Sequence, residues 1–133
     1  MKEYSVELGG AQHALRYTLT ERKELEKRYA KGLRELILTD VYPLDEKNEP
    51  TGGGLIERQI AFLFMGIRHK AGPKFTEQKL EGWIDDAVLK GGHMLIYLTH
   101  AVRAAMASGV LGYVIEASEE PEEEKGKAEA SPE

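Results

Sequence analysis

Four histidines are the residues of this sequence best suited to proton transfer near neutral pH, because imidazole titrates closest to that range. They are His13, His69, His93 and His100. Zinc motifs on a helix usually place two histidines four residues apart with an acid nearby, whereas His93 and His100 are seven residues apart. We interpret all four as packing or helix-end residues and predict no catalytic residue, no metal site and no cofactor.

Three other patterns that resemble catalytic sites lack a necessary part. Asp85 and Asp86 are adjacent on an expected helix, so their side chains point in different directions and do not form a dyad. The glycines at 52–54 are followed by Leu-Ile-Glu, without the Gly-Lys-Ser/Thr ending of a phosphate-binding loop. The chain has no cysteine, which excludes disulfides, thiolate zinc sites and cysteine nucleophiles. We therefore expect a protein that is not an enzyme.

A helix-turn-helix that binds DNA is a non-enzymatic alternative for the two helices expected on either side of residues 70–75. The second helix of that motif must present polar or basic side chains to the major groove. In this sequence its charged residues are mainly acidic: Glu77, Glu81, Asp85 and Asp86 against Lys79 and Lys90. Such a helix repels phosphate, so we predict no nucleic-acid partner.

Charge divides the chain into two parts. The net charge is −5, and the last sixteen residues hold seven glutamates and two lysines, which leaves residues 1–117 neutral. With 133 residues, 41% of them hydrophobic, the chain is long enough for one core. We predict one domain over 1–117 and a disordered acidic tail over 118–133. No apolar run is long enough to span a membrane, so we expect a cytosolic protein without a membrane partner.

The N-terminal residues alternate between apolar and polar. Tyr4, Val6 and Leu8 share one face, Gly9-Gly10 follows, and a second alternation covers 15–19. This pattern predicts two short strands joined by a glycine turn. A hairpin of this size must pack against helices to be stable.

A helix is predicted to follow from about Thr20 to Leu38. Thr18 and Glu21 have the spacing of a capping box, and apolar residues then recur at helical intervals. Glu24 and Arg28 are expected to form an exposed pair one turn apart. From Thr39 to Gly54 the periodicity disappears and Pro, Asp, Asn and Gly accumulate, which indicates a long loop.

Three further helices are expected. The first covers 55 to about 69 and is apolar on most sides, so it should lie at the centre of the fold. The next begins after Thr76 as N-cap, directs a stripe inward (Leu80, Trp83, Ile84, Ala87 and Val88) and ends at Gly91-Gly92. The last covers about 93–108. The sequence thus predicts a mainly α fold of about four principal helices with an N-terminal two-stranded hairpin.

The last helix is apolar on two faces. Leu95, Leu98, Val102 and Met106 form the face expected to join the core. The other face requires either a second neighbour within the chain or a partner. We take its residues as the candidate protein-binding site: Ile96, Tyr97, His100, Ala101 and Ala104.

The sequence between residues 4 and 109 resembles the tail assembly chaperones of long-tailed bacteriophages and gene transfer agents. The resemblance rests on Leu-Gly-Gly at 8–10, Leu-Arg-Tyr-Thr at 15–18 and Met-Gly-Ile-Arg-His at 65–69. It continues with Phe-Thr-Glu-Gln-Lys-Leu-Glu-Gly-Trp-Ile-Asp at 75–85, in which Gln78 stands where the family usually has Glu. The loop at 39–54 is longer than in shorter relatives.

The resemblance implies a protein that binds the tape measure protein, keeps it soluble and helps to recruit tail tube subunits. It also implies self-association, a place in the host cytoplasm and absence from the mature virion. Two alternatives stay open: another tail component, such as a completion or connector protein, and a helical regulator of a host protein.

The family is also made in a longer form, through a backward slip of the ribosome near the end of the short reading frame. Lys125-Gly126-Lys127 is a peptide that a slippery heptamer can encode. An ordinary acidic tail with two incidental lysines is the alternative, and the nucleotide sequence decides between them.

Overall fold

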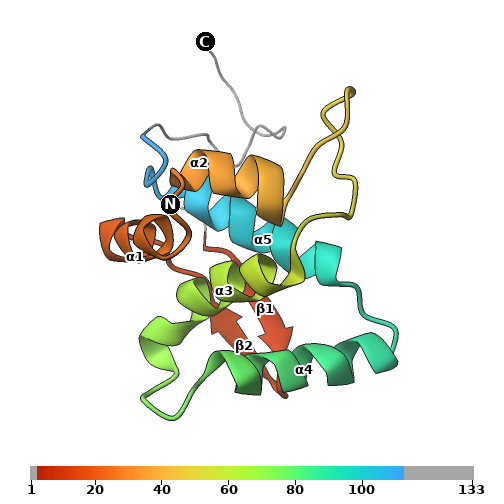
Figure 1. Cartoon of the computed structure of the whole chain (residues 1–133). Helices are drawn as coiled ribbons and strands as arrows, with labels where there is room; N and C mark the ends of the chain where they lie inside the picture. Colours follow the sequence, from red (N-terminus) through yellow and green to blue (C-terminus); the bar gives the residue numbers. More distant parts are fainter. Residues whose placement is uncertain (1–2, 113–133) are drawn as a thin grey trace, which may run out of the picture.

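Helix α3 (Ile56–Ile67) lies at the centre of the protein, as its sequence predicts. The computed structural model describes residues 3–112, in which five α-helices follow an N-terminal hairpin (Figure 1). All of α3 between Gln59 and Ile67 is buried except Phe64, which is half-buried. The predicted mainly α fold with a two-stranded hairpin is confirmed. The predicted acidic tail at 118–133 lies outside the described residues.

The hairpin consists of β1 (Ser5–Leu8) and β2 (Ala11–Ala14), paired antiparallel with Leu8 opposite Ala11. Gly9 and Gly10 have φ of 62° and 81°, the left-handed conformation that a two-residue hairpin turn requires. The second strand was predicted over the alternation at 15–19, but the strand that pairs with β1 covers Ala11–Ala14. It ends at Ala14, and Leu15 and Tyr17 continue into the core as extended chain, while exposed Leu19 already begins the next helix.

Helix α1 (Leu19–Tyr29) begins with the predicted capping box: the Thr18 backbone N–H donates to Glu21 Oε1 at 2.6 Å. The prediction of one helix from 20 to 38 is wrong. The chain turns at Ala30, whose φ is 54°, and resumes as α2 (Leu33–Leu36) and a π-helical turn, η1 (Ile37–Val41). Glu26 stabilises the break, because its carboxylate accepts the Leu33 N–H at 2.7 Å.

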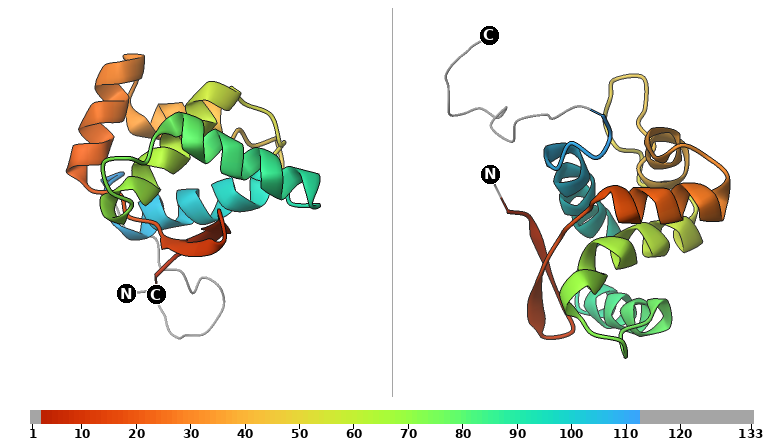
Figure 2. Two further views of the ribbon diagram at one scale, coloured as in Figure 1. Left: turned by 90° about the horizontal axis from the view of Figure 1, so that it is seen from below. Right: turned by 90° about the vertical axis from the view of Figure 1, so that its left-hand side faces the viewer.

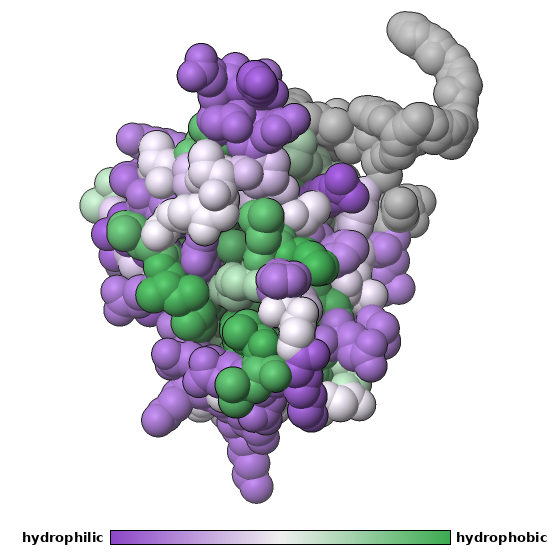
Figure 3. All heavy atoms as spheres, turned by 90° about the vertical axis from the view of Figure 1, so that its right-hand side faces the viewer, coloured by the Kyte–Doolittle hydropathy of each residue, from purple (hydrophilic) through white to green (hydrophobic). Residues whose placement is uncertain are grey.

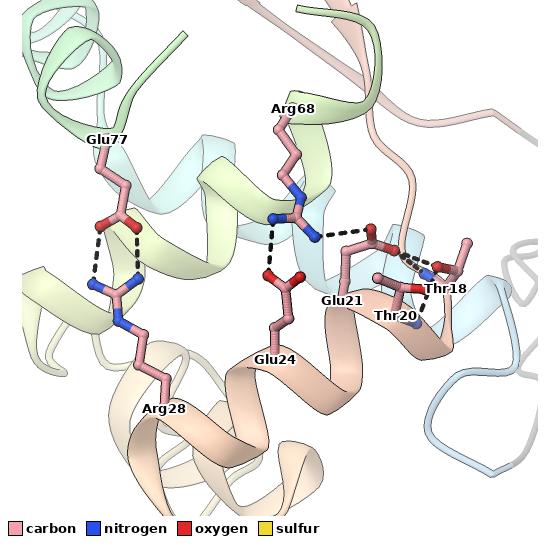
Figure 4. A network of polar contacts seen from close by, with 7 residues as sticks. All are labelled: Thr18, Thr20, Glu21, Glu24, Arg28, Arg68 and Glu77. Carbon is pink, nitrogen blue, oxygen red and sulfur yellow. Dashed lines mark hydrogen bonds and ion pairs between the residues drawn. The ribbon is translucent and has the colours of Figure 1, made fainter. Parts of the chain in front are cut away.

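Helix α1 is joined to two later elements by ion pairs (Figure 4). Arg68, in the 3-10 turn η2 (Arg68–Lys70), donates to Glu24 at 2.9 Å and to Glu21 at 3.4 Å. Arg28 donates both terminal nitrogens to Glu77, at 2.6 and 3.1 Å. The expected Glu24–Arg28 pair is therefore corrected: both residues bind partners more than forty positions away in the sequence.

Helices α4 (Glu77–Leu89) and α5 (Met94–Ala107) complete the fold. Thr76 caps α4 as predicted, and its hydroxyl accepts the Lys79 N–H at 3.1 Å. Helix α5 contacts α3 on one side and β1 on another, and α4 also contacts both α3 and β1. In the views of Figure 2 the hairpin accordingly lies alongside the helices as an outer layer of the fold.

The segment between η1 and α3 is the predicted long loop, now bounded by Tyr42 and Leu55. It folds back on itself through an isolated bridge between Leu44 and Pro50. At the other end of the chain, Val110 is buried in a turn after α5, and residues 113–115 lie outside the described residues.

Candidate protein-binding surface

Exposed apolar residues are found at the ends of three helices, and these ends lie toward the same side of the fold in Figure 1. They belong to the start of α3, the end of α4 and the first turn of α5: Leu55, Ile56, Val88, Leu89 and Ile96. We call these five residues the apolar face. Figure 3 shows hydrophobic residues collected in the middle of this side of the molecule, with hydrophilic residues around them. Leu89 is 85% exposed and Ile56 58%, so more than half of each of these apolar residues is open to solvent.

The turn between α4 and α5 sets the position of Leu89 and Ile96. Helix α4 ends with backbone bonds from Gly91 to Val88 and from Gly92 to Ala87, the latter at 2.8 Å. A Cβ on Gly92 would lie 2.8 Å from the Tyr97 hydroxyl and 3.0 Å from the Ala87 carbonyl oxygen. The end of α4 and the start of α5 therefore approach so closely that a side chain at position 92 would force them to move.

The base of the long loop sets the position of Leu55 and Ile56. The Leu55 N–H donates to the Asp40 carbonyl at 2.7 Å, and the Gln59 amide donates to the carbonyls of Val41 and Gly53 at 3.0 and 2.8 Å. Gln59 is buried, so these bonds are shielded from water. The first turn of α3 is thereby fixed to the end of η1.

Asp40 strengthens the same junction with its side chain. Its carboxylate accepts from Arg58 at 2.5 Å and from Lys31 at 3.1 Å. Burial alone raises the pKa of Asp40, but hydrogen bonds from Arg58, Lys31 and Thr39 outweigh it, and the pKa lies below its ordinary value. A buried carboxylate with two cationic partners holds η1, α3 and the chain before α2 together.

The structure divides the five residues that we predicted as a binding site on α5. Ile96 is 52% exposed and belongs to the apolar face, while Tyr97 and His100 are half-buried. Ala101 and Ala104 are corrected: they are 0% and 6% exposed, in the core. The physical reason is that α5 has two neighbours within the chain, α3 and β1, which is the alternative to a partner that the two apolar faces left open.

Four members of the apolar face were missed by sequence reasoning. Val88 was assigned to the inward stripe of α4, but only Leu80 and Ile84 of that stripe are buried. Leu89 lies five residues beyond Ile84, about 140° around the helix, and that offset is a signal in the sequence. Leu55 and Ile56 gave no signal, because their exposure depends on where the long loop folds.

The histidines and paired aspartates do not converge on one site. His13 and His69 bind backbone carbonyl oxygens, of Leu8 at 2.9 Å and Ala14 at 2.8 Å. Asp85 and Asp86 are exposed on α4. Among residues 3–112, no group of three or more His, Asp or Glu is arranged to hold a metal ion.

Comparison of the chain with protein-family models, curated proteins and solved structures gave no match. Within the described part of the chain, no helix has both the length and the apolar character needed to cross a membrane.

Proposed function

We propose that this protein is a tail assembly chaperone that binds an apolar helical segment of a tape measure protein on the apolar face. The observation that carries the proposal is the gathering of Leu55, Ile56, Val88, Leu89 and Ile96 at adjoining helix ends, each at least 48% exposed. Apolar helix faces are commonly bound by grooves and patches of this composition, with charged residues at the rim. The resemblance between residues 4 and 109 supplies the identity of the partner.

The charged residues around the apolar face suit a chaperone better than a permanent subunit interface. Asp85, Asp86 and Glu57 are exposed beside the apolar positions in sequence. Charged groups at a rim keep the free protein soluble and prevent non-specific association. In this proposal the chaperone covers the tape measure protein in the host cytoplasm, helps to recruit tail tube subunits, self-associates along the extended partner and leaves before the virion is complete.

The first experiment is co-expression of the full chain with the tape measure protein encoded in the same genome. The measured quantity is the fraction of tape measure protein that stays in the supernatant after ultracentrifugation. We expect the wild-type chain to raise that fraction and the double variant L89E/I96E to lose the effect. L19E is the matched control, since Leu19 is 66% exposed on α1, on the other side of the molecule (Figure 1).

Two results would contradict this proposal. One is a folded wild-type chain that leaves the tape measure protein insoluble. The other is an equal loss of solubility with L19E and L89E/I96E. A gene position away from the tail tube and tape measure genes would favour another tail component or a regulator of a host protein. The nucleotides encoding Lys125-Gly126-Lys127 and an open −1 frame beyond Glu133 would test the longer form.

A further inference from the structure

A pocket of about 310 Å³ lies between β2, the turn η2 and the start of α4, separate from the apolar face. Three of its ten lining residues are lysines, Lys70, Lys74 and Lys79, and none is acidic. All three lysines are exposed. The pocket is therefore a local positive site, although residues 1–117 of the sequence have equal numbers of acidic and basic residues.

One wall of the pocket is a fixed aromatic stack. Trp83 stacks on His13 at 5.0 Å and on Phe75 at 5.1 Å between ring centres, and Phe75 stacks on Phe64. A Cβ on Gly9 would lie 2.4 Å from the indole, so the hairpin turn also holds Trp83 in place. The charged side chains thus project around a preformed apolar wall, a combination that suits the stems and carboxylates of glutamate side chains.

The lysines of the pocket are not among the cationic groups that form ion pairs within the described residues. Arg22, Arg28, Arg58 and Arg68 each form an ion pair, as does Lys31. Within residues 3–112, no ion pair of Lys70, Lys74 or Lys79 is present. Three positive charges around one pocket, none of them neutralised by an ion pair, attract a group that carries several negative charges.

We propose that this lysine pocket binds the acidic sequence Glu119–Glu124 of the same chain. That sequence, Glu-Glu-Pro-Glu-Glu-Glu, has five carboxylates in six residues, which complement the three lysines. Its charge is only partly offset by Lys125 and Lys127 of the same tail, and residues 1–117 have equal numbers of acidic and basic residues.

The length of chain after Gly112 is sufficient for this contact. Glu119 is seven positions after Gly112 in the sequence, and Glu124 is twelve positions after it. At about 3.3 Å per residue, these separations allow about 23 to 40 Å of reach. A domain of about 100 residues has a radius of gyration of about 13 Å, so this reach is comparable with the dimensions of the domain. The end of α5 and the length of α4 lie on different sides in Figure 1.

The contact is expected to be weak for each charge pair and to depend on salt. Exposed ion pairs contribute at most about 1 kcal/mol each, but attachment to the same chain gives an effective concentration of about millimolar. At about 1 M salt the Debye length falls to about 3 Å, and the attraction is then screened.

The chain is suited to a direct test, because it has one tryptophan and no cysteine. A nitroxide placed on A128C of the full-length protein would broaden the single Trp83 indole N–H resonance when the acidic sequence occupies the pocket. We expect at least a twofold loss of peak intensity at about 0.05 M salt and its recovery at about 1 M salt. The variant K70Q/K74Q/K79Q should show no broadening at either salt concentration.

The matched control is K23Q/K27Q/K47Q, which removes three exposed lysines elsewhere on the fold and should leave the broadening intact. A second sample mixes protein that carries the nitroxide but no NMR isotope with isotope-enriched protein that carries no nitroxide. Broadening in this mixture can arise only from contacts between chains. Absence of broadening at low salt, broadening that appears only between chains, or equal losses in the two triple variants would each overturn the proposal.

Discussion

The Tyr17 hydroxyl donates a hydrogen bond of 2.7 Å to the carbonyl oxygen of Phe62, and the two rings stack 4.7 Å apart. This contact joins the chain that leaves the hairpin to the central helix, forty-five residues later. Burial is the main cause that raises the pKa of Tyr17 well above its ordinary value, so the phenol stays protonated and remains a donor.

The same contact predicts the effect of G66A. A Cβ on Gly66 would lie 2.5 Å from the Tyr17 hydroxyl oxygen, so alanine overfills this site. The clash should cost about 1–3 kcal/mol, more than the about 1 kcal/mol that alanine gains over glycine in a helix. Urea unfolding of G66A measures the net change in the free energy of unfolding, which we expect to be a loss. The cost should be smaller in a Y17A background, because the ring atoms Cζ and Cε2, at 2.6 and 2.8 Å from that Cβ, are removed together with the hydroxyl. An unchanged cost there would show that Tyr17 is not the obstacle.

The lowered pKa of Asp40 predicts that the free energy of unfolding decreases in acid. Its pKa is depressed in the folded protein, so its contribution is present above the unfolded value of about 3.9 and is lost as the pH falls through the folded pKa. D40N should lower the free energy of unfolding at pH 7 by about 1–3 kcal/mol. Because the pKa of Glu21 is also lowered, D40N should weaken the acid dependence without abolishing it. An acid dependence identical to wild type would contradict this role.

Arg28 and Arg68, the two arginines of Figure 4, should differ in how much each contributes to the free energy of unfolding. Arg28 and Glu77 are 42% and 31% exposed, so R28Q should cost less than about 1 kcal/mol. Arg68 binds Glu21, whose side chain is only 11% exposed. R68Q would leave that buried carboxylate without its cation and should lower the free energy of unfolding by about 1–3 kcal/mol. Thermal unfolding of both variants under one buffer compares them directly. Equal effects would argue against burial as the deciding factor.

Two glycines of the long loop provide a matched pair. Gly52 and Gly54 both have positive φ, 81° and 113°, but only at Gly54 would a Cβ meet other atoms, at 2.5 Å from the Asp40 carbonyl oxygen. G54A should therefore cost about 1–3 kcal/mol more than G52A. It should also speed hydrogen exchange of the Leu55 N–H. Equal exchange in the two variants would mean that the loop base is not a rigid support for Leu55 and Ile56.

Neighbouring positions on α5 separate surface from core. I96E should leave the free energy of unfolding within about 0.5 kcal/mol of wild type, because Ile96 is 52% exposed. Y97E should destabilise by about 1–3 kcal/mol, since Tyr97 packs against the core and against Gly92. Circular dichroism and analytical ultracentrifugation check stability and self-association. If Y97E keeps full stability and loses self-association, Tyr97 is an interface residue, as the sequence led us to expect.

The sequence by itself predicted those features of the fold that are determined by residues close to one another in the chain. Thr18 with Glu21 and Thr76 before α4 predict helix starts, and Gly9-Gly10 predicts the hairpin turn. Helix α3 was identified as central because its apolar residues surround it, a property that does not depend on which neighbours cover them. For the helix starts and the turn, the free energy that decides the structure comes from contacts within a few residues, whereas for α3 the apolar composition of the segment already requires burial on most sides.

Tertiary contacts decided the rest. The helical pattern runs through Ala30, yet the chain breaks there, because Glu26 caps a second helix that directs Leu33 and Leu36 into the core. The apolar residues of α5 cannot be told apart in the sequence, but Ala101 is buried in a helix that contacts both α3 and β1, while Ile96 in the first turn of that helix is 52% exposed. Burial depends on which segments meet across the fold, and periodicity in one segment specifies a face without specifying what covers it.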